Sequence, residues 1–245
     1  MQVPVRWPAP DAIGAFSSTR RGGVSSGPFA SLNLSVGTGD AAADVAANVA
    51  RLTAACALPH APHWPRQVHG TAVVEAGRLH RASVQADAVF TTRPGVICSV
   101  RTADCLPVLL CARDASAVAA AHAGWRGLAA GVLEAAVSAL EVPPAAILAW
   151  LGPAIGPAVY EVGDEVRSAF LAVDRAAGAA FARSPRGRWL ADLYTLARQR
   201  LRGAGVQAIH GGGYCTYADR LHFYSYRRDG ATGRMATGIW IKPLA

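Results

Sequence analysis

The stretch that decides the fold covers residues 95–127, GVICSVRTADCLPVLLCARDASAVAAAHAGWRG. It holds three β-type runs, at 95–101, 106–112 and 116–121, with only a few residues between them. Connections this short cannot contain a crossover helix, so the runs predict antiparallel strand pairs in the middle of the chain.

Helices and further strands are expected on both sides of this stretch. The apolar spacing predicts helices over 41–55 (with Asp40 as N-cap), 128–140, 160–172 and 190–202. Strand patterns lie at 71–76, 86–91, 146–151, 206–210, 221–226 and 238–242, and the polar stretch 14–39 is expected to be a long loop. Interleaved helices and strands with antiparallel pairs predict a mixed α/β architecture.

Composition narrows the class of protein. The chain has 245 residues, of which 52% are hydrophobic and 16% charged, and it shows no repeat or low-complexity linker. We therefore expect one domain over residues 1–245. The net charge of +8 comes almost entirely from dispersed arginines, with no basic run longer than two residues. That pattern favours an anionic small-molecule substrate over nucleic acid.

The sequence also carries expectations about location. Apolar stretches stop well short of the roughly 20 residues of a membrane span, and the first residues lack the pattern of a secretory signal. Five scattered cysteines without a CxxC pair fit reduced thiols. We expect a cytoplasmic protein without a membrane partner, and the sequence does not indicate its oligomeric state.

Three segments each place one histidine or cysteine at the end of a predicted strand: RQVHG (66–70), TADCLP (102–107) and AHAGWRG (121–127). His69, Cys105 and His122 together make a ligand set that suits zinc. Three protein ligands would leave the fourth tetrahedral position open, as in catalytic zinc sites. Asp104 is a candidate for proton transfer or for orienting a ligand.

The same residues allow other interpretations. Separations of 36 and 17 residues match no short zinc-finger pattern, and each residue alone is compatible with a structural role. Cys105 could instead be a nucleophile, with His69 or His122 as its base, in a hydrolase or amidase. A third interpretation is a non-catalytic module with a structural zinc ion. Such a site would need a fourth protein ligand, and the three segments contain no further His or Cys.

Motifs along nearly the whole chain resemble the YfiH/PgeF family, also known as the laccase-domain or polyphenol-oxidase-like family. They are SSTRRGGVS (17–25), SLNL (31–34), QVHG (67–70), ADAVF (86–90), TADCLPVLL (102–110), AAAHAGWRGL (119–128), WLGPAIGP (150–157), YEVGDEV (160–166) and FYSYRRDGATGRMA (223–236).

The resemblance implies a single-domain, four-layer αββα sandwich with mixed sheets, related to cysteine hydrolases of the cytotoxic-necrotizing-factor type. It also implies one zinc ion held by His69, Cys105 and His122. The implied activities are phosphorolysis of adenosine, inosine and methylthioadenosine, deamination of adenosine, and a part in editing peptidoglycan precursors. A nucleotide-linked muropeptide is then a further possible substrate, and a muropeptide-like substrate would also suit the alternative hydrolase or amidase with Cys105 as its nucleophile.

Substrate-binding candidates come from two sources. Arg20 and Asn33 match family motifs in the predicted loop. Arg126 is a candidate because it lies at the start of a predicted helix, where free backbone amides and a guanidinium group favour the binding of an anion. Copper oxidase chemistry is not expected, because seven histidines without an HxH pair and two methionines are too few ligands for four coppers.

Overall fold

The larger of two facing sheets has six strands. The computed structural model describes residues 1–78 and 84–243. The strand order is β12 (Ala208–Gly211), β8 (Ile147–Leu151), β6 (Leu106–Ala112), β7 (Val118–Ala123), β4 (Ala88–Thr91) and β3 (Val73–Glu75). β6 pairs antiparallel with β7 and β8, whereas β12–β8 and β3–β4 are parallel. The sheet is therefore mixed, as predicted.

The smaller sheet has four strands and joins distant parts of the chain. Its order is β1 (Gln2–Val3), β2 (Ile13–Ser18), β13 (Met235–Ile241) and β5 (Ile97–Thr102), all antiparallel. β5 thus pairs in this sheet, although β6 follows it in the other sheet after only three residues. The turn from β5 to β6 is therefore a crossing point between the two sheets.

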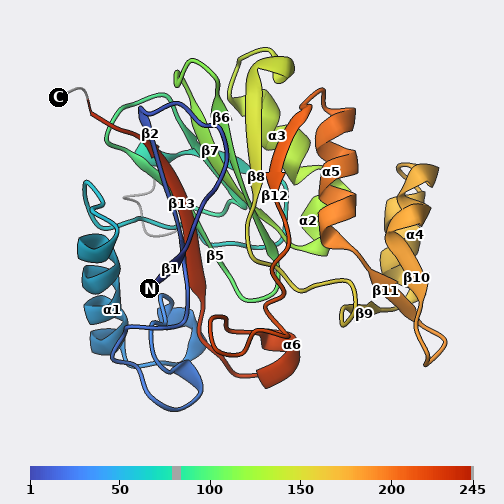
Figure 1. Cartoon of the computed structure of the whole chain (residues 1–245), viewed down its shortest axis with the longest axis horizontal. Helices are drawn as coiled ribbons and strands as arrows, with labels where there is room; N and C mark the ends of the chain where they lie inside the picture. The colour runs from blue at the N-terminus through green and yellow to red at the C-terminus, as the bar shows by residue number, and fades with distance from the viewer. Residues whose placement is uncertain (79–83, 244–245) are drawn as a thin grey trace.

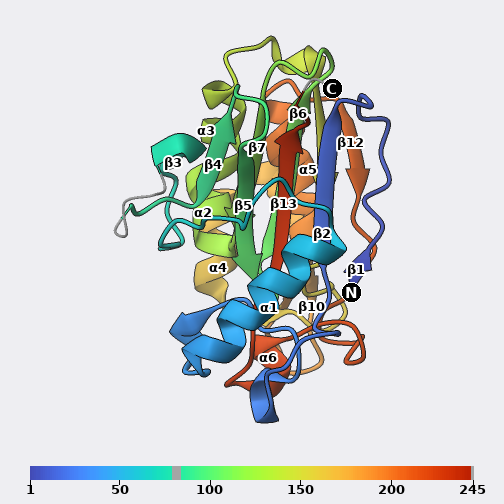
Figure 2. The same cartoon turned by 90° about the vertical axis from the view of Figure 1, so that its left-hand side faces the viewer.

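Helices cover both outer faces (Figure 1). α1 (Ala42–Ala55) packs on the four-stranded sheet, where Leu52 joins Phe16 and Trp240 in one apolar cluster (Figure 2). α2 (Trp125–Ala130), α3 (Val132–Ala139) and α5 (Leu193–Gly203) cover the six-stranded sheet. β6 is buried along its full length, which explains its unbroken apolar sequence.

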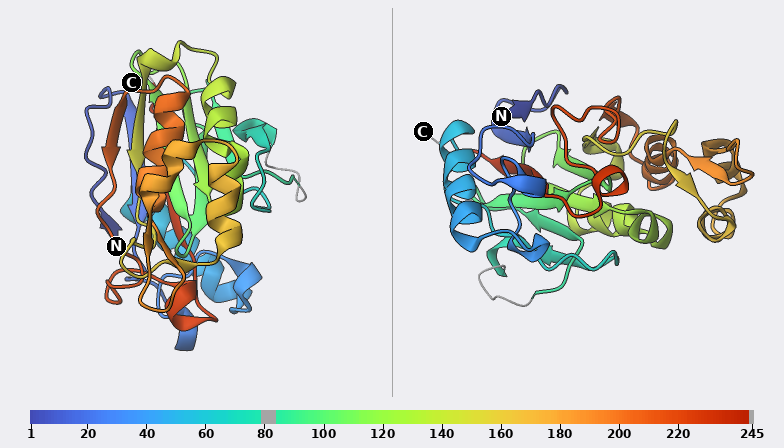
Figure 3. Two further views of the ribbon diagram at one scale, coloured as in Figure 1. Left: turned by 90° about the vertical axis from the view of Figure 1, so that its right-hand side faces the viewer. Right: turned by 90° about the horizontal axis from the view of Figure 1, so that it is seen from below.

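A small unit extends beyond α5 (Figure 3). It contains α4 (Asp164–Leu171) and a three-stranded sheet of β10 (Phe181–Arg183), β11 (Trp189–Ala191) and β9 (Glu161–Val162). The remaining short elements are α6 (Tyr226–Asp229) and the 3-10 helices Gly27–Phe29, Val36–Thr38, Ala76–Arg78, Pro144–Ala146 and Arg175–Ala180. Within the described residues, none of the helices has the length and apolarity needed to cross a bilayer.

Several predicted boundaries need correction. The strand expected at 221–226 is wrong: this segment is made of turns that lead into α6. The Arg228 guanidinium donates to the carbonyls of Thr216, Tyr217 and Phe223, and these bonds fold the segment back on itself. The helix expected over 128–140 begins earlier and is divided at Gly131, whose φ of 105° is outside the helical region.

Two further corrections concern the amino-terminal third. The expected loop over 14–39 begins inside β2, whose hydroxyl-rich end is buried. Asp40 is not the N-cap of α1; that position belongs to Ala41. The Asp40 carboxylate instead accepts hydrogen bonds from Ser25 and Asn33 and closes the loop onto itself.

Candidate active site

The three predicted metal ligands come together at the crossing point between the sheets. His122 lies on β7, Cys105 immediately precedes β6, and the register pairs Pro107 with His122, so Cys105 and His122 are neighbours. His69 lies in the turn at residues 67–70, and its Nε2 is 3.9 Å from the Cys105 Sγ. The ligand atoms of all three lie within 4.8 Å of one another, so this group could hold a metal ion.

A buried carboxylate, Asp87, orients two of the three ligands. Its Oδ1 accepts from His122 Nδ1 at 2.8 Å and from the His69 amide at 2.9 Å, and its Oδ2 accepts from the Gly70 amide at 2.7 Å. The Val68 amide donates to the same carboxylate. Three consecutive amides turned toward one carboxylate account for the left-handed φ of 62° at His69. With Nδ1 committed to Asp87, His122 has Nε2 available for a metal.

Asp87 was missed in the sequence, although it lies inside the ADAVF motif. The signal that could have identified it is a lone Asp among small apolar residues at the start of a strand. A buried carboxylate requires partners, and those partners are usually part of a site. Burial raises the pKa of Asp87, but the hydrogen bonds from His122 and the amides outweigh burial and hold the pKa below its ordinary value.

The charges of Cys105 and His122 are coupled in the protein without metal. Burial raises the pKa of the Cys105 thiol, but the charges and hydrogen bonds of His122 and His69 lower it to about 6. Burial likewise lowers the pKa of His122, whereas Cys105 and Asp87 raise it to about 9. At neutral pH, Cys105 is therefore a thiolate beside the imidazolium of His122. A metal cation that displaces the proton of His122 would bind a cysteine that is already deprotonated.

The donor set and the space around it fit a zinc ion. Tetrahedral zinc with bonds of about 2.3 Å to sulfur and about 2.0 Å to nitrogen would place those two atoms about 3.5 Å apart. The Sγ–Nε2 distance of 3.9 Å thus requires only a small contraction. Gly124 keeps the approach clear, because a Cβ there would lie 2.8 Å from His69 Cδ2. Among the described residues, no fourth His, Cys, Asp or Glu joins the group.

The ligand group opens into a cavity of about 660 Å³. Its wall is strongly basic: five arginines line it, together with the aromatic side chains of Trp125, Tyr160 and Tyr226. The arginines are Arg66, Arg101, Arg126, Arg227 and Arg234. Apart from Asp104, no carboxylate is among the described residues of this wall.

Besides the three ligands, two predicted site residues lie on the wall. The Arg126 guanidinium stacks on Trp125, 4.4 Å from the ring centroid. Both carboxylate oxygens of Asp104 are engaged by the protein, one by the Thr216 hydroxyl at 2.6 Å and one by the Arg227 amide at 2.7 Å. These bonds tie the β5–β6 turn to α6, which supports the orienting role for Asp104 over proton transfer.

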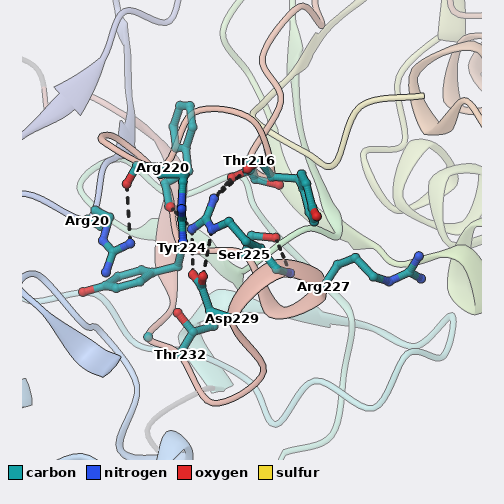
Figure 4. Close-up of polar contacts among 12 residues, drawn as sticks. Arg20, Thr216, Arg220, Tyr224, Ser225, Arg227, Asp229 and Thr232 are labelled. Atoms are coloured by element: carbon teal, nitrogen blue, oxygen red, sulfur yellow. Dashed lines mark hydrogen bonds and ion pairs between the residues drawn. The ribbon is translucent and has the colours of Figure 1, made fainter. Parts of the chain in front are cut away.

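Arg20 and Asn33 are not brought to this wall. Arg20 donates to the Ala30 carbonyl and lies 4.6 Å from the centroid of the Tyr224 ring. The Arg227 side chain, which lines the cavity, points away from Arg20 and Tyr224 (Figure 4). Asn33 is fully buried, and its Oδ1 accepts from the Arg234 amide at 2.8 Å. Both residues brace the amino-terminal loop, and Asn33 is linked to the cavity wall through the backbones of Ser35 and Arg234.

Three of the five arginines were not identified as substrate-binding candidates in the sequence. Arg66, Arg101 and Arg234 come from separate segments, and each one alone resembles a surface arginine. Only the pairing of strands brings them to one wall. Tyr160 was missed for the same reason; it is 9% exposed and faces the ligand group.

The role of Asp87 can be tested with Asp87→Asn. The amide cannot accept all four hydrogen bonds, so His69 and His122 lose their fixed orientation. We expect zinc affinity to fall roughly 10- to 100-fold. Competition with a chromophoric chelator measures this change, with Asp114→Asn as the control because Asp114 is exposed. Unchanged zinc affinity in Asp87→Asn would contradict the role given to Asp87.

The space kept by Gly124 leads to a second prediction. In Gly124→Ala the new Cβ would approach His69 Cδ2 at 2.8 Å and Cys105 Sγ at 3.1 Å, so the ligands must separate. We expect loss of bound zinc, measured by mass spectrometry of the metal content, while circular dichroism keeps its folded spectrum. Gly203→Ala on α5 is the matched control, since no heavy atom lies within 4 Å of its added Cβ. Full zinc occupancy in Gly124→Ala would show that this contact does not shape the site.

Comparison with known proteins agrees with this geometry over nearly the whole chain. A family model described as multi-copper polyphenol oxidoreductase laccase matches residues 14–242. The purine nucleoside phosphorylase YfiH of Escherichia coli strain K12 is 55% identical over 236 residues, which cover 96% of this chain and 97% of that protein. A purine nucleoside phosphorylase of Pseudomonas aeruginosa is 53% identical over 237 residues, covering 96% of each.

Solved structures show the same fold. A Neisseria meningitidis protein matches with a TM-score of 0.95 and 45% identity, covering 99% of each chain. YlmD from Geobacillus stearothermophilus matches with a TM-score of 0.86 and 32% identity, covering 95% of this chain and 93% of that chain. The laccase family model and both phosphorylases match this chain over nearly its full length. The chain therefore belongs to the YfiH family.

Proposed function

We propose that this protein is a zinc-dependent purine nucleoside phosphorylase that works in the cavity beside His69, Cys105 and His122. The observation that carries the proposal is that one cavity joins a group able to hold a metal, five arginines and three aromatic side chains. The two purine nucleoside phosphorylases of Escherichia coli and Pseudomonas aeruginosa are each more than half identical to this chain, which supports the same reaction here.

The reaction assigns a task to each part of the wall. A phosphate oxygen forms a bond to C1′ of the ribose while the C1′–N9 bond breaks, and the departing purine takes up a proton. Guanidinium groups bind the phosphate and neutralise its charge. The faces of Trp125, Tyr160 and Tyr226 suit a planar purine. Zinc, when bound by the three ligands, supplies a Lewis acid.

Finer assignments rest on the family resemblance. We propose adenosine, inosine and methylthioadenosine as the nucleosides, and deamination of adenosine as a second reaction of the same site. A part in editing peptidoglycan precursors, a nucleotide-linked substrate and a cytoplasmic location stay predictions. Copper oxidase chemistry is not proposed, because a single group of three ligands among the described residues is too small for a multi-copper centre.

An assay with adenosine tests the proposal. We expect adenine and ribose 1-phosphate in equal amounts, formed only when phosphate is present, and inosine if deamination also occurs. Cys105→Ala is expected to lose its zinc and at least about 100-fold in kcat/KM, because loss of a ligand removes the Lewis acid. Cys56→Ala serves as the control, since Cys56 lies outside the cavity wall. Release of adenine without consumption of phosphate would rule out phosphorolysis.

One observation favours a second candidate, a hydrolase that uses Cys105 as its nucleophile. His122 and His69 lower the pKa of this thiol to about 6 despite its burial, as in enzymes with an activated cysteine. The fold relationship to cysteine hydrolases, implied by the resemblance, points the same way. The two candidates differ in metal content, because a thiolate bound to zinc is not free to attack a substrate.

Alkylation by iodoacetamide separates these candidates. In the metal-free protein the thiolate predominates above its pKa, so we expect the rate at Cys105 to rise with pH and to reach half its maximum near pH 6. In His122→Ala the midpoint should move to higher pH, since the imidazolium that lowers the pKa is gone. Zinc should protect Cys105. A zinc-loaded protein that is alkylated as fast as the metal-free form would favour the nucleophile.

A further inference from the structure

Two arginines of the cavity wall are placed side by side by the pairing of β5 with β13. Arg101 on β5 is opposite Ala236 on β13. Arg234 lies two residues before Ala236, so it is the diagonal neighbour of Arg101 on the same face of the sheet. Arg101 is near the end of β5 and Arg234 immediately precedes β13, and the start of β13 is the end of that strand nearest α6 (Figure 1). The fold therefore brings two like charges together.

Carbonyl groups and aromatic rings, rather than carboxylates, contact the two guanidinium groups. Among the ion pairs of the described residues, none includes Arg101 or Arg234. Arg101 donates from Nη1 to the Leu34 carbonyl, and Arg234 donates from Nη1 to the Thr232 and Gly233 carbonyls. Each guanidinium has five N–H donors, so most of them remain available.

Holding these charges together has a cost in free energy. Both side chains are partly buried, and burial together with the charge of Arg234 lowers the pKa of Arg101. Guanidinium groups stay protonated at neutral pH, so the repulsion persists. An anion between them would remove the repulsion and use the remaining donors.

The pair is also held in a fixed position. The Gln67 side chain donates to the Arg101 carbonyl at 2.8 Å and accepts from the Arg101 amide at 2.9 Å. The Asn33 side chain accepts from the Arg234 amide at 2.8 Å. These backbone contacts come from two segments, which is typical of a preorganised site.

Four arginines on the wall lie near an aromatic ring: Arg101 is 5.2 Å from the centroid of the Trp64 ring, and Arg234 is 6.0 Å from that of the Tyr226 ring. Arg126 stacks on Trp125. Arg227 lies over the Tyr160 ring and donates to the Glu161 carbonyl at 2.6 Å. Arg234 lines the same cavity as Cys105 and Asp104, near enough for their charges to act on it. An anion bound by Arg101 and Arg234 would therefore lie beside the metal ligands.

We propose that Arg101 and Arg234 together form the subsite that binds inorganic phosphate. The inference rests on the proposed phosphorolysis and deepens it, because it assigns the co-substrate to two residues. Their planar forks match the oxygens of a tetrahedral oxyanion and can each bind two of them. Asn33 and Gln67 are then positioning residues for this subsite.

The test compares Arg101→Gln and Arg234→Gln with Arg202→Gln, an exposed arginine at the end of α5. Isothermal titration of the zinc-loaded protein with inorganic phosphate gives the affinity, and steady-state kinetics give the KM for phosphate and for adenosine separately. We expect each cavity variant to weaken phosphate binding roughly 10- to 100-fold. The KM for adenosine and the zinc content should change less than about twofold, as in a protein that loses one isolated subsite.

Arg101→Lys and Arg234→Lys cover the case in which a glutamine variant fails to fold. Lysine keeps the charge but not the fork, so phosphate affinity should lie between those of the wild type and the glutamine variant. Phosphate binding that is unchanged in all cavity variants, or absent in the wild type, overturns the subsite. Phosphate binding that depends on the pair, in a protein that cleaves no nucleoside, upholds the subsite and overturns the proposed function.

Discussion

The buried carboxylate of Asp87 is the group on which the site depends. It accepts hydrogen bonds from the amides of residues 68–70 and from the imidazole of His122, and its side chain is inaccessible to water. A carboxylate buried without such partners would be strongly unfavourable, so the turn at His69 and the ring of His122 must both adopt positions that serve it. Two of the three ligands are thereby fixed by one interaction, and the third needs only the register of β6 against β7.

The crossing between the sheets imposes the second constraint. β5 ends in the four-stranded sheet and β6 starts in the six-stranded sheet, so residues 103–105 must change direction abruptly. Asp104 takes a φ of 90° there, and its carboxylate holds Thr216 and the Arg227 amide in place. Cys105 is consequently at a point where both sheets and α6 meet. This location explains why a cavity forms beside the thiol.

Much of this arrangement could be predicted from the sequence, because it depends on local patterns. The apolar runs of β6 and β7 and the helix over 42–55 are set by spacing alone, and the ligand types suggested zinc chemistry. Arg101 and Arg234 could not be found in this way, since they are brought together by a strand pairing that joins residue 101 to residue 236. Asp87 leaves only a weak local signal, because its partners lie 17 or more residues away. The strand expected at 221–226 failed for a related reason: the Arg228 side chain bonds to nearby carbonyls and overrides a β-type sequence.

The charge of the cavity bears on which reaction the site suits. Five arginines face one carboxylate and one thiolate, and a divalent metal would add further positive charge. A neutral nucleoside with a water molecule, as hydrolysis or deamination requires, leaves this excess uncompensated. A nucleoside with phosphate brings two negative charges to the wall, where guanidinium groups bind oxyanions strongly. The same positive field stabilises charge that moves from the phosphate toward the departing purine. Among the reactions open to a metal site of this kind, the electrostatics therefore favour phosphorolysis.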